Sequence, residues 1–134
     1  MLSWRRFTPT SDTSLLITME NDFHIVYPDD YKKVSMQYNK GVLNRMSIMC
    51  GNIERVFGRL ISIDPCVHPN ILDAKKWVAD ENGLFPFGTD PFGNLFAFKF
   101  STADRYEIVF YDMENGIESS ISASFSEFLN NLYE

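Results

Sequence analysis

The chain has 134 residues, 45% of them hydrophobic, which is enough for one domain with a buried core that needs neither disulfide nor metal. Its formal charge of −6 argues against direct binding to nucleic acid, because an acidic surface repels phosphate backbones. No apolar run approaches the ~20 residues of a membrane helix, and the first residues lack the apolar core of a signal peptide. We therefore expect a cytoplasmic protein with reduced cysteines and no membrane contact.

The domain is expected to span residues 1–134, with residues 1–21 as a loosely attached arm. Residues 1–14 are polar and irregular, and Leu15–Phe23 fits either a short strand or a helical turn. A helix is predicted to begin around Pro28, because proline fits a first turn and the acids that follow favour the positive end of the helix dipole. Gly41 is predicted to end this helix in the left-handed conformation.

The middle of the chain predicts two strands and a helix. Two β-rich runs on either side of Gly51 predict strands at Val42–Cys50 and Val56–Ile63. Asn70 is a suitable cap for a helix that runs from Ile71 to about Asn82 and ends at Gly83.

The C-terminal third predicts three strands and a helix. Asn94–Phe100 alternates, with Phe96, Phe98 and Phe100 on one face, and a polar link joins it to a second strand at Tyr106–Asp112. Asn115-Gly116 is a turn signal, so Ile117–Ile121 is expected to return as a third strand. Ser124 and Glu127 form a capping-box pattern before a helix whose apolar stripe is Phe125, Phe128, Leu129 and Leu132.

Residue types that carry catalysis or bind metals are scarce. Cys66 and His68 are close in sequence, but zinc needs three or four such ligands and the chain has only two Cys and two His. A nucleophilic pair of Cys50 with His24 or His68 requires contact in space, and no strained nucleophile turn surrounds either cysteine. We expect no catalytic residue, no metal and no cofactor, and hence a protein that is not an enzyme. A small hydrolase is the least supported class.

Three motifs in order resemble the SMI1/KNR4 (SUKH) superfamily, from about Asp22 to the C-terminus. Tyr27–Lys32 and Tyr38–Gly41 are similar to the family's opening helix and the turn that ends it, although Tyr27 replaces a leucine and Lys40 a glycine. Phe85–Gly88 is similar to the leucine-proline-phenylalanine motif before a hairpin, and Ser124–Leu129 to the closing helix.

The resemblance implies an α+β fold, an SMI1/KNR4-like (SUKH) single domain with a mainly antiparallel sheet and helices packed against it. The predicted elements favour the same class independently, because strands cluster, helices lie at both ends and no βαβ alternation is present. The resemblance also implies an immunity protein that binds a cognate bacterial toxin and neutralises it by occluding its active site. A nuclease effector of a contact-dependent or polymorphic toxin system suits the acidic charge, since carboxylates mimic phosphates. The alternative is a non-enzymatic regulatory scaffold of the same fold.

Acidic and aromatic side chains near the predicted hairpins are the candidates for the partner-binding surface. Aromatic residues are enriched in interfaces, and acids beside them favour encounter with a basic partner. The same acids also fit an ordinary solvated strand face, and solubility alone accounts for the overall charge. The candidates are Asp90, Phe92, Glu107, Tyr111, Asp112, Glu114 and Glu118.

Overall fold

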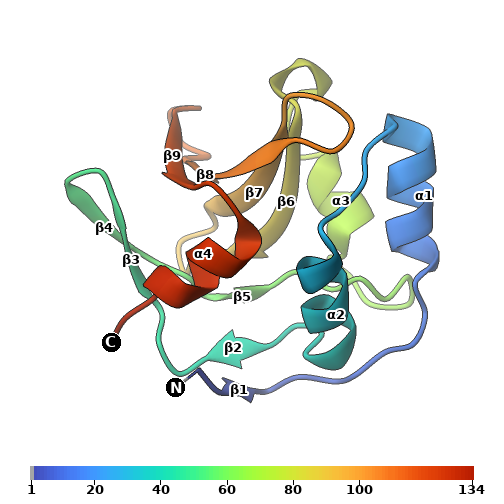
Figure 1. Ribbon diagram of the computed structural model, residues 1–134, viewed down its shortest axis with the longest axis horizontal. Helices are drawn as coiled ribbons and strands as arrows, with labels where there is room; N and C mark the ends of the chain where they lie inside the picture. Colours follow the sequence, from blue (N-terminus) through green and yellow to red (C-terminus); the bar gives the residue numbers. More distant parts are fainter. Residues whose placement is uncertain (1) are drawn as a thin grey trace.

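The computed structural model describes residues 2–134, which form four α-helices, one 3-10 helix and nine strands (Figure 1). The helices are α1 (Ser14–Phe23), α2 (Asp29–Gln37), α3 (Ile71–Lys75) and α4 (Phe125–Asn131), and the 3-10 helix η1 spans Asp80–Asn82. The strands are β1 (Trp4–Arg5), β2 (Val42–Leu43), β3 (Ser47–Cys50), β4 (Ile53–Val56), β5 (Arg59–Leu60), β6 (Leu84–Thr89), β7 (Leu95–Phe100), β8 (Tyr106–Tyr111) and β9 (Glu118–Ser122).

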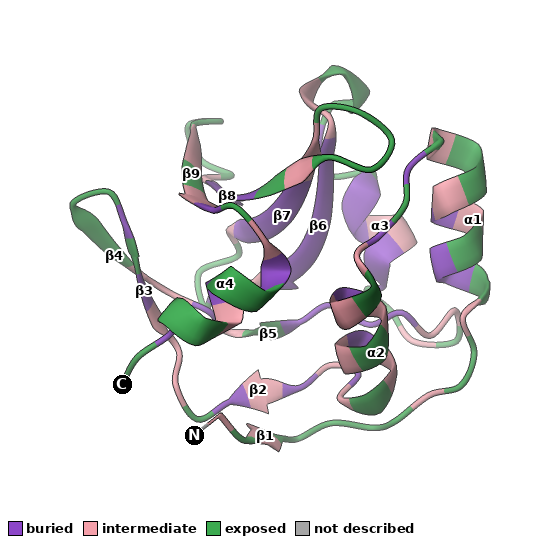
Figure 2. Ribbon diagram, in the orientation of Figure 1, coloured by how far each residue is buried: buried purple, intermediate pink, exposed green. Residues whose placement is uncertain are grey.

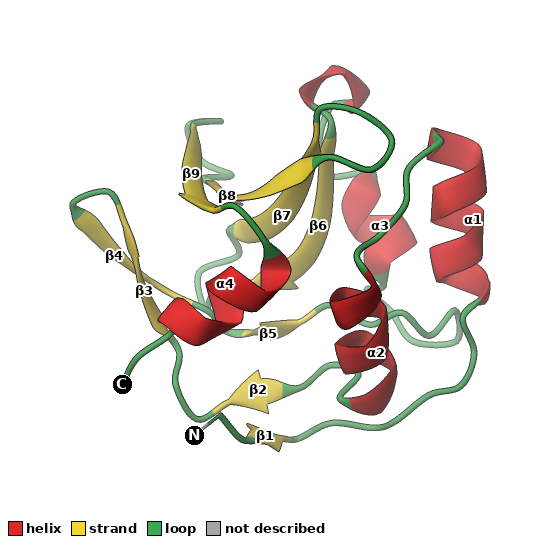
Figure 3. Ribbon diagram, in the orientation of Figure 1, coloured by secondary structure: helices red, strands yellow, loops and turns green. Residues whose placement is uncertain are grey.

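The main sheet has five antiparallel strands in the order β5-β6-β7-β8-β9 (Figure 3). The pairs β1-β2 and β3-β4 form separate two-stranded antiparallel ribbons. Helix α4 lies across the sheet, and α1, α2 and α3 gather on the other side of the molecule (Figure 1). This arrangement confirms the predicted α+β class with a mainly antiparallel sheet.

Two predicted strands are shorter and more broken than expected. Gly51, with φ of 62°, turns the chain sharply into the β3–β4 hairpin. Beyond β4 the chain bends at Phe57, whose fully buried ring enters the core. The predicted continuous strand over Val42–Cys50 is wrong in extent, since residues 44–46 separate β2 from β3. The predicted strand over Val56–Ile63 is also wrong in extent, because core packing at Phe57 outweighs local β propensity.

The helix predicted over Ile71–Asn82 is also wrong in extent. Asn70 caps it as predicted, and its Oδ1 accepts hydrogen bonds from two backbone N–H groups of the first turn. Yet α3 ends at Lys75, because Val78 must leave the helical path to pack on the outer face of the sheet. Val78 packs there with Leu84, Leu95, Ala97 and Val109.

The N-terminal segment contacts the rest of the chain along much of its length. Strand β1 pairs with β2, and the Thr10 N–H donates to the carbonyl of Met36 at 2.9 Å. The segment that fitted either a strand or a helical turn is helix α1, which contributes three buried side chains to the core, Leu15, Leu16 and Met19.

The turn after α2 differs from the prediction at Gly41. The left-handed residue is Lys40, with φ of 65°, and its carbonyl accepts from Nε and Nη2 of Arg59. Gly41 is needed for space instead, since a Cβ there would lie 2.7 Å from the Trp4 ring and from the Tyr38 carbonyl oxygen.

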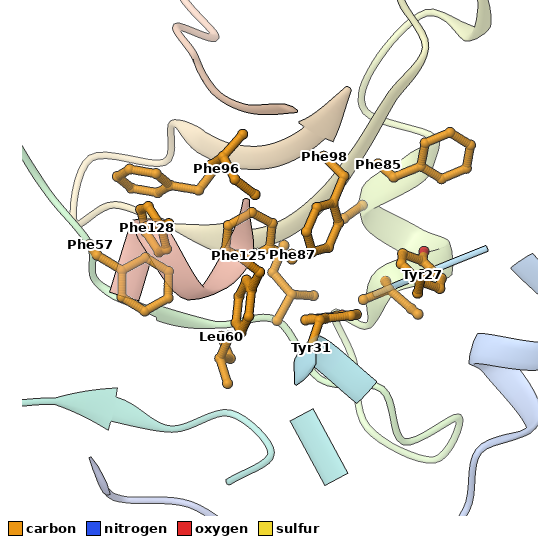
Figure 4. Packing of buried hydrophobic residues seen from close by; sticks show 14 of the residues in the cluster. Tyr27, Tyr31, Phe57, Leu60, Phe85, Phe87, Phe96, Phe98, Phe125 and Phe128 are labelled. Atoms are coloured by element: carbon orange, nitrogen blue, oxygen red, sulfur yellow. The ribbon is translucent and has the colours of Figure 1, made fainter. Parts of the chain in front are cut away.

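Aromatic side chains from α2, β6, β7 and α4 form the centre of the core (Figure 4). Phe96 and Phe98 face the same way, as the alternation predicts, and the Phe87 ring lies 4.7 Å from that of Phe98. The Phe87 ring also lies edge-on at 5.5 Å from both Phe125 and Phe128 of α4, a geometry that aromatic quadrupoles favour. Figure 2 shows that burial is concentrated in β6 and β7, whereas the tips of the turns are exposed.

Candidate partner-binding surface

Two turns meet at one end of the main sheet. The β6–β7 turn spans 90–94 and the β8–β9 turn spans 112–117, and β7 and β8 pair side by side between them. The Met113 N–H donates to Oδ1 of Asn94 at 3.0 Å, and this bond joins the two turns. We call these residues, together with Tyr111 and Glu118 beside them, the two-turn surface.

The first turn is organised around Asp90, which is only 7% exposed. Its Oδ1 accepts from the Phe92 N–H at 2.9 Å and the Asn94 N–H at 2.7 Å, and its Oδ2 accepts from Nδ2 of Asn94 at 2.9 Å. These bonds occupy the carboxylate inside its own turn. Asp90 therefore fixes the shape of the first turn, and its buried carboxylate is not presented to a partner.

The second turn is organised in the same way by Asp112. Its Oδ1 accepts from the Glu114 N–H at 2.9 Å and from the Asn115 N–H at 3.4 Å. The side chain of Asn115 in turn accepts from the Ile117 N–H at 2.9 Å. Short polar side chains that bond to their own backbone fix a turn, so both tips are held in one shape.

Three large apolar side chains project from these fixed tips. Phe92 is 85% exposed, Ile117 is 58% exposed and Met113 is 41% exposed. Glu114 is exposed beside them, and Tyr111 is half-buried. Exposed aromatic and aliphatic residues held in place and bordered by acids are typical of a binding surface, because little entropy is lost when a partner covers them.

Of the seven candidates, six lie in the two-turn surface: Asp90, which holds the first turn, and Phe92, Tyr111, Asp112, Glu114 and Glu118. Glu118 lies directly opposite Tyr111 in the sheet and forms an ion pair with Lys99. Glu107 is exposed but stands four residues from Tyr111 on β8, about 13 Å away at the rise of a strand, and it accepts a hydrogen bond from Ser120. It therefore lies apart from the two turns.

Sequence reasoning missed Met113, Ile117 and the connecting Asn94. Met113 and Ile117 lie in a turn whose other residues are polar or glycine. Residues of such a turn are expected to be exposed, so an apolar side chain there is not expected to pack in the core. That mismatch was a usable signal. The bond from Met113 to Asn94 has no such signal, because it joins residues that are 19 positions apart.

The groups considered for catalysis lie apart from this surface. Cys50 is buried, and burial raises the pKa of its thiol, which disfavours the nucleophilic thiolate although Arg55 opposes the shift. Nδ1 of His68 is 2.6 Å from Oδ2 of Asp73, and this hydrogen bond holds the pKa of the Asp73 carboxyl below its usual value. Among residues 2–134, no group of three or more His, Cys, Asp or Glu side chains is placed to hold a metal ion.

A family model described as SMI1-KNR4 cell-wall, SUKH_6, matches residues 13–129. The chain belongs to the SMI1/KNR4 (SUKH) superfamily. Membership supports the immunity-protein family in general, whose members are generally non-enzymatic and generally bind a protein partner. No curated protein and no solved structure matches this SUKH chain.

The matched segment of this SUKH chain includes both turns and all seven candidates. It also includes the turn after α2, where the left-handed Lys40 takes the place of a glycine in the family pattern. In the part of the chain that the structure describes, no helix combines the length and apolar character needed to cross a membrane.

Proposed function

We propose that this SUKH domain is an immunity protein that binds one cognate bacterial toxin directly and neutralises it. The two-turn surface is the docking site in this proposal. The observation that carries it is the exposure of Phe92 and Ile117 on turns that hydrogen bonds hold rigid, in a chain of an immunity-protein family. Apolar anchors on a fixed scaffold supply affinity with little loss of entropy.

The charge of the surface indicates a basic partner. Asp112 and Glu114 lie in the second turn, and residues 90–94 and 112–118 include no Lys or Arg. Glu118 lies beside the turn and is paired with Lys99. Acids at the rim of an interface speed the encounter with a basic protein and help to exclude other partners. A nuclease active site is basic because it binds phosphates, so a nuclease effector of a contact-dependent or polymorphic toxin system suits this surface. Neutralisation follows from occlusion of that active site.

Co-expression tests the function. The toxin domain encoded beside this gene is expressed alone and together with the SUKH chain, and growth is measured with the toxin level checked in each culture. We expect growth to be restored and the two proteins to elute as one complex. The proposal fails if the neighbouring protein is harmless alone, or if growth is restored without a complex. If the chain is instead a regulatory scaffold, we expect the partner that copurifies with it to be non-toxic.

Matched variants test the docking site. Ile117→Ala removes an exposed side chain from the two-turn surface, whereas Ile17→Ala removes the same side chain from α1, where it is 52% exposed. We expect only the first to weaken protection. Glu114→Lys should weaken protection more than Glu81→Lys, which reverses an exposed charge on η1. Equal effects on protection within both pairs would show that the docking site is not the two-turn surface. That result would not contradict the immunity function.

A further inference from the structure

A small basic cavity is lined by residues outside the two-turn surface. It has a volume of about 180 Å³ and lies between the end of α2, strand β5, the loop before α3 and the end of β6. Its polar lining comes from Lys40, Arg59, Ser62, His68 and Thr89. Three of these side chains are basic and no acidic residue lines the cavity, although the chain as a whole carries a charge of −6.

The nearest carboxylates on the adjoining loop and helix are already bonded. Oδ1 of Asp64 accepts from the Cys66 N–H at 2.8 Å. Oδ2 of Asp73 accepts from the Asn70 N–H at 3.0 Å and from Nδ1 of His68. The ionised Asp73 makes Nδ1 of His68 the donor, which holds the ring in place beside the cavity. The local charge of the lining is therefore set by Lys40 and Arg59.

Hydrogen-bond donors around the cavity lack acceptors. Ser62 is buried, and its Oγ accepts from Nδ2 of Asn39 at 3.1 Å and from the Asp64 N–H at 3.0 Å. Among residues 2–134 the Ser62 hydroxyl donates no hydrogen bond, and Lys40 forms no salt bridge. A buried hydroxyl whose hydrogen lacks an acceptor is unfavourable unless a ligand supplies one.

Hydrogen bonds to the Lys40 backbone fix the Arg59 guanidinium at the cavity. Nε and Nη2 of Arg59 donate to the Lys40 carbonyl at 3.2 and 3.0 Å, which fixes the guanidinium and leaves Nη1 for another acceptor. Lys40 itself has φ of 65°, a conformation that favours glycine. Lysine at this position places a cation at the cavity where glycine would be the less strained residue.

We propose that this cavity binds a phosphate-class oxyanion. A fixed guanidinium, an ammonium and two hydroxyls match the charge and several acceptor oxygens of a phosphoryl group. The cavity is smaller than the ~300–1,000 Å³ of typical small-molecule sites, so it fits a group of few atoms rather than a whole cofactor. Oxyanion binding at this cavity does not depend on toxin binding, and it can be measured on the chain alone.

Titration of the full chain with inorganic phosphate tests the site, with amide chemical shifts recorded at constant ionic strength in chloride. We expect saturable shifts confined to the residues that line the cavity. Lys40→Gln should weaken affinity about tenfold or more, since it removes one charged hydrogen-bond donor. Lys33→Gln removes the same charge from an exposed position on α2 outside the cavity and should leave affinity unchanged.

A second variant separates binding from folding. Lys40→Gly should lose affinity as Lys40→Gln does, yet melt no lower than the parent chain, because glycine adopts the left-handed conformation without strain. Titration with adenosine monophosphate distinguishes the source of the phosphoryl group: tighter binding than inorganic phosphate assigns a monoester, and equal or weaker binding assigns free phosphate. Absence of saturable shifts, equal loss in Lys33→Gln, or tighter binding of acetate would overturn the proposal.

Discussion

Met113 donates its backbone N–H to Oδ1 of Asn94 at 3.0 Å, so the tips of two separate hairpins are joined across the sheet. The same Asn94 side chain donates to Asp90 at 2.9 Å. One amide therefore connects a buried carboxylate in the first turn to the backbone of the second, and the apolar residues on both tips are held in a single arrangement.

Asn94→Ala is expected to lower the free energy of unfolding by about 1–3 kcal/mol, because it removes a partner of the buried Asp90 carboxylate and the acceptor of Met113. Urea denaturation measures this change. Asn130→Ala, at an exposed position on α4, is the matched control and should change stability by less than about 0.5 kcal/mol. Equal stability of the two variants would show that the bonds of Asn94 contribute nothing.

Phe128→Ala and Phe92→Ala form a pair in which the same side chain is lost from opposite environments. Phe128 is fully buried against Phe57, Phe87 and Phe96, and its loss should cost about 3–5 kcal/mol. Phe92 is almost fully exposed, and its loss should change stability by less than about 0.5 kcal/mol. A small effect at Phe128 would contradict the position of α4 over the sheet.

Tyr31→Phe is expected to leave the protein as stable as the parent or to stabilise it by about 1 kcal/mol. The Tyr31 hydroxyl is buried and has no hydrogen-bond partner in the described chain, so its removal eliminates an unfavourable group. Tyr106→Phe is the comparison, since the Tyr106 hydroxyl accepts from the Phe125 N–H at 2.9 Å and its loss should cost about 1 kcal/mol. A loss of stability in Tyr31→Phe would indicate an unseen partner.

Stability is expected to fall at alkaline pH because of Tyr27 and Tyr31. Burial raises the pKa of both hydroxyls above the usual value, so above pH ~10 the unfolded chain loses these protons while the folded chain retains them. The unfolded state then binds fewer protons, and the free energy of unfolding decreases as pH rises. Denaturation at a series of alkaline pH values should show a shallower decrease in the Tyr27→Phe, Tyr31→Phe double variant. An identical slope would contradict this assignment.

Sequence patterns predicted the elements whose local signals agree with the core. Ser124 caps α4 as expected, with Oγ 3.1 Å from the Glu127 N–H, and Phe96 and Phe98 face the core as the alternation requires. Sequence patterns failed to predict the end of an element where contacts between residues distant in the sequence determine it. Val78 ends the expected long helix by packing on the sheet, and no signal in its neighbourhood reveals this contact.

The candidate site was predictable in composition but not in arrangement. Exposed Phe92 and the acids of the second turn stand out in the sequence as residues without a core role. Asp90 looks equally available there, and only the structure shows its carboxylate bonded within its own turn. The separation of Glu107 from the turns likewise depends on strand register, which sequence alone leaves open.

Direct binding is best measured by calorimetric titration of the purified chain with the proposed toxin, the domain encoded beside its gene. We expect a one-to-one complex that weakens at high salt, because surface charges are screened. We also expect Phe92→Ala and Ile117→Ala to weaken binding strongly, while Ile17→Ala binds as the parent does. Absence of binding by the folded parent chain would contradict the claim of direct neutralisation.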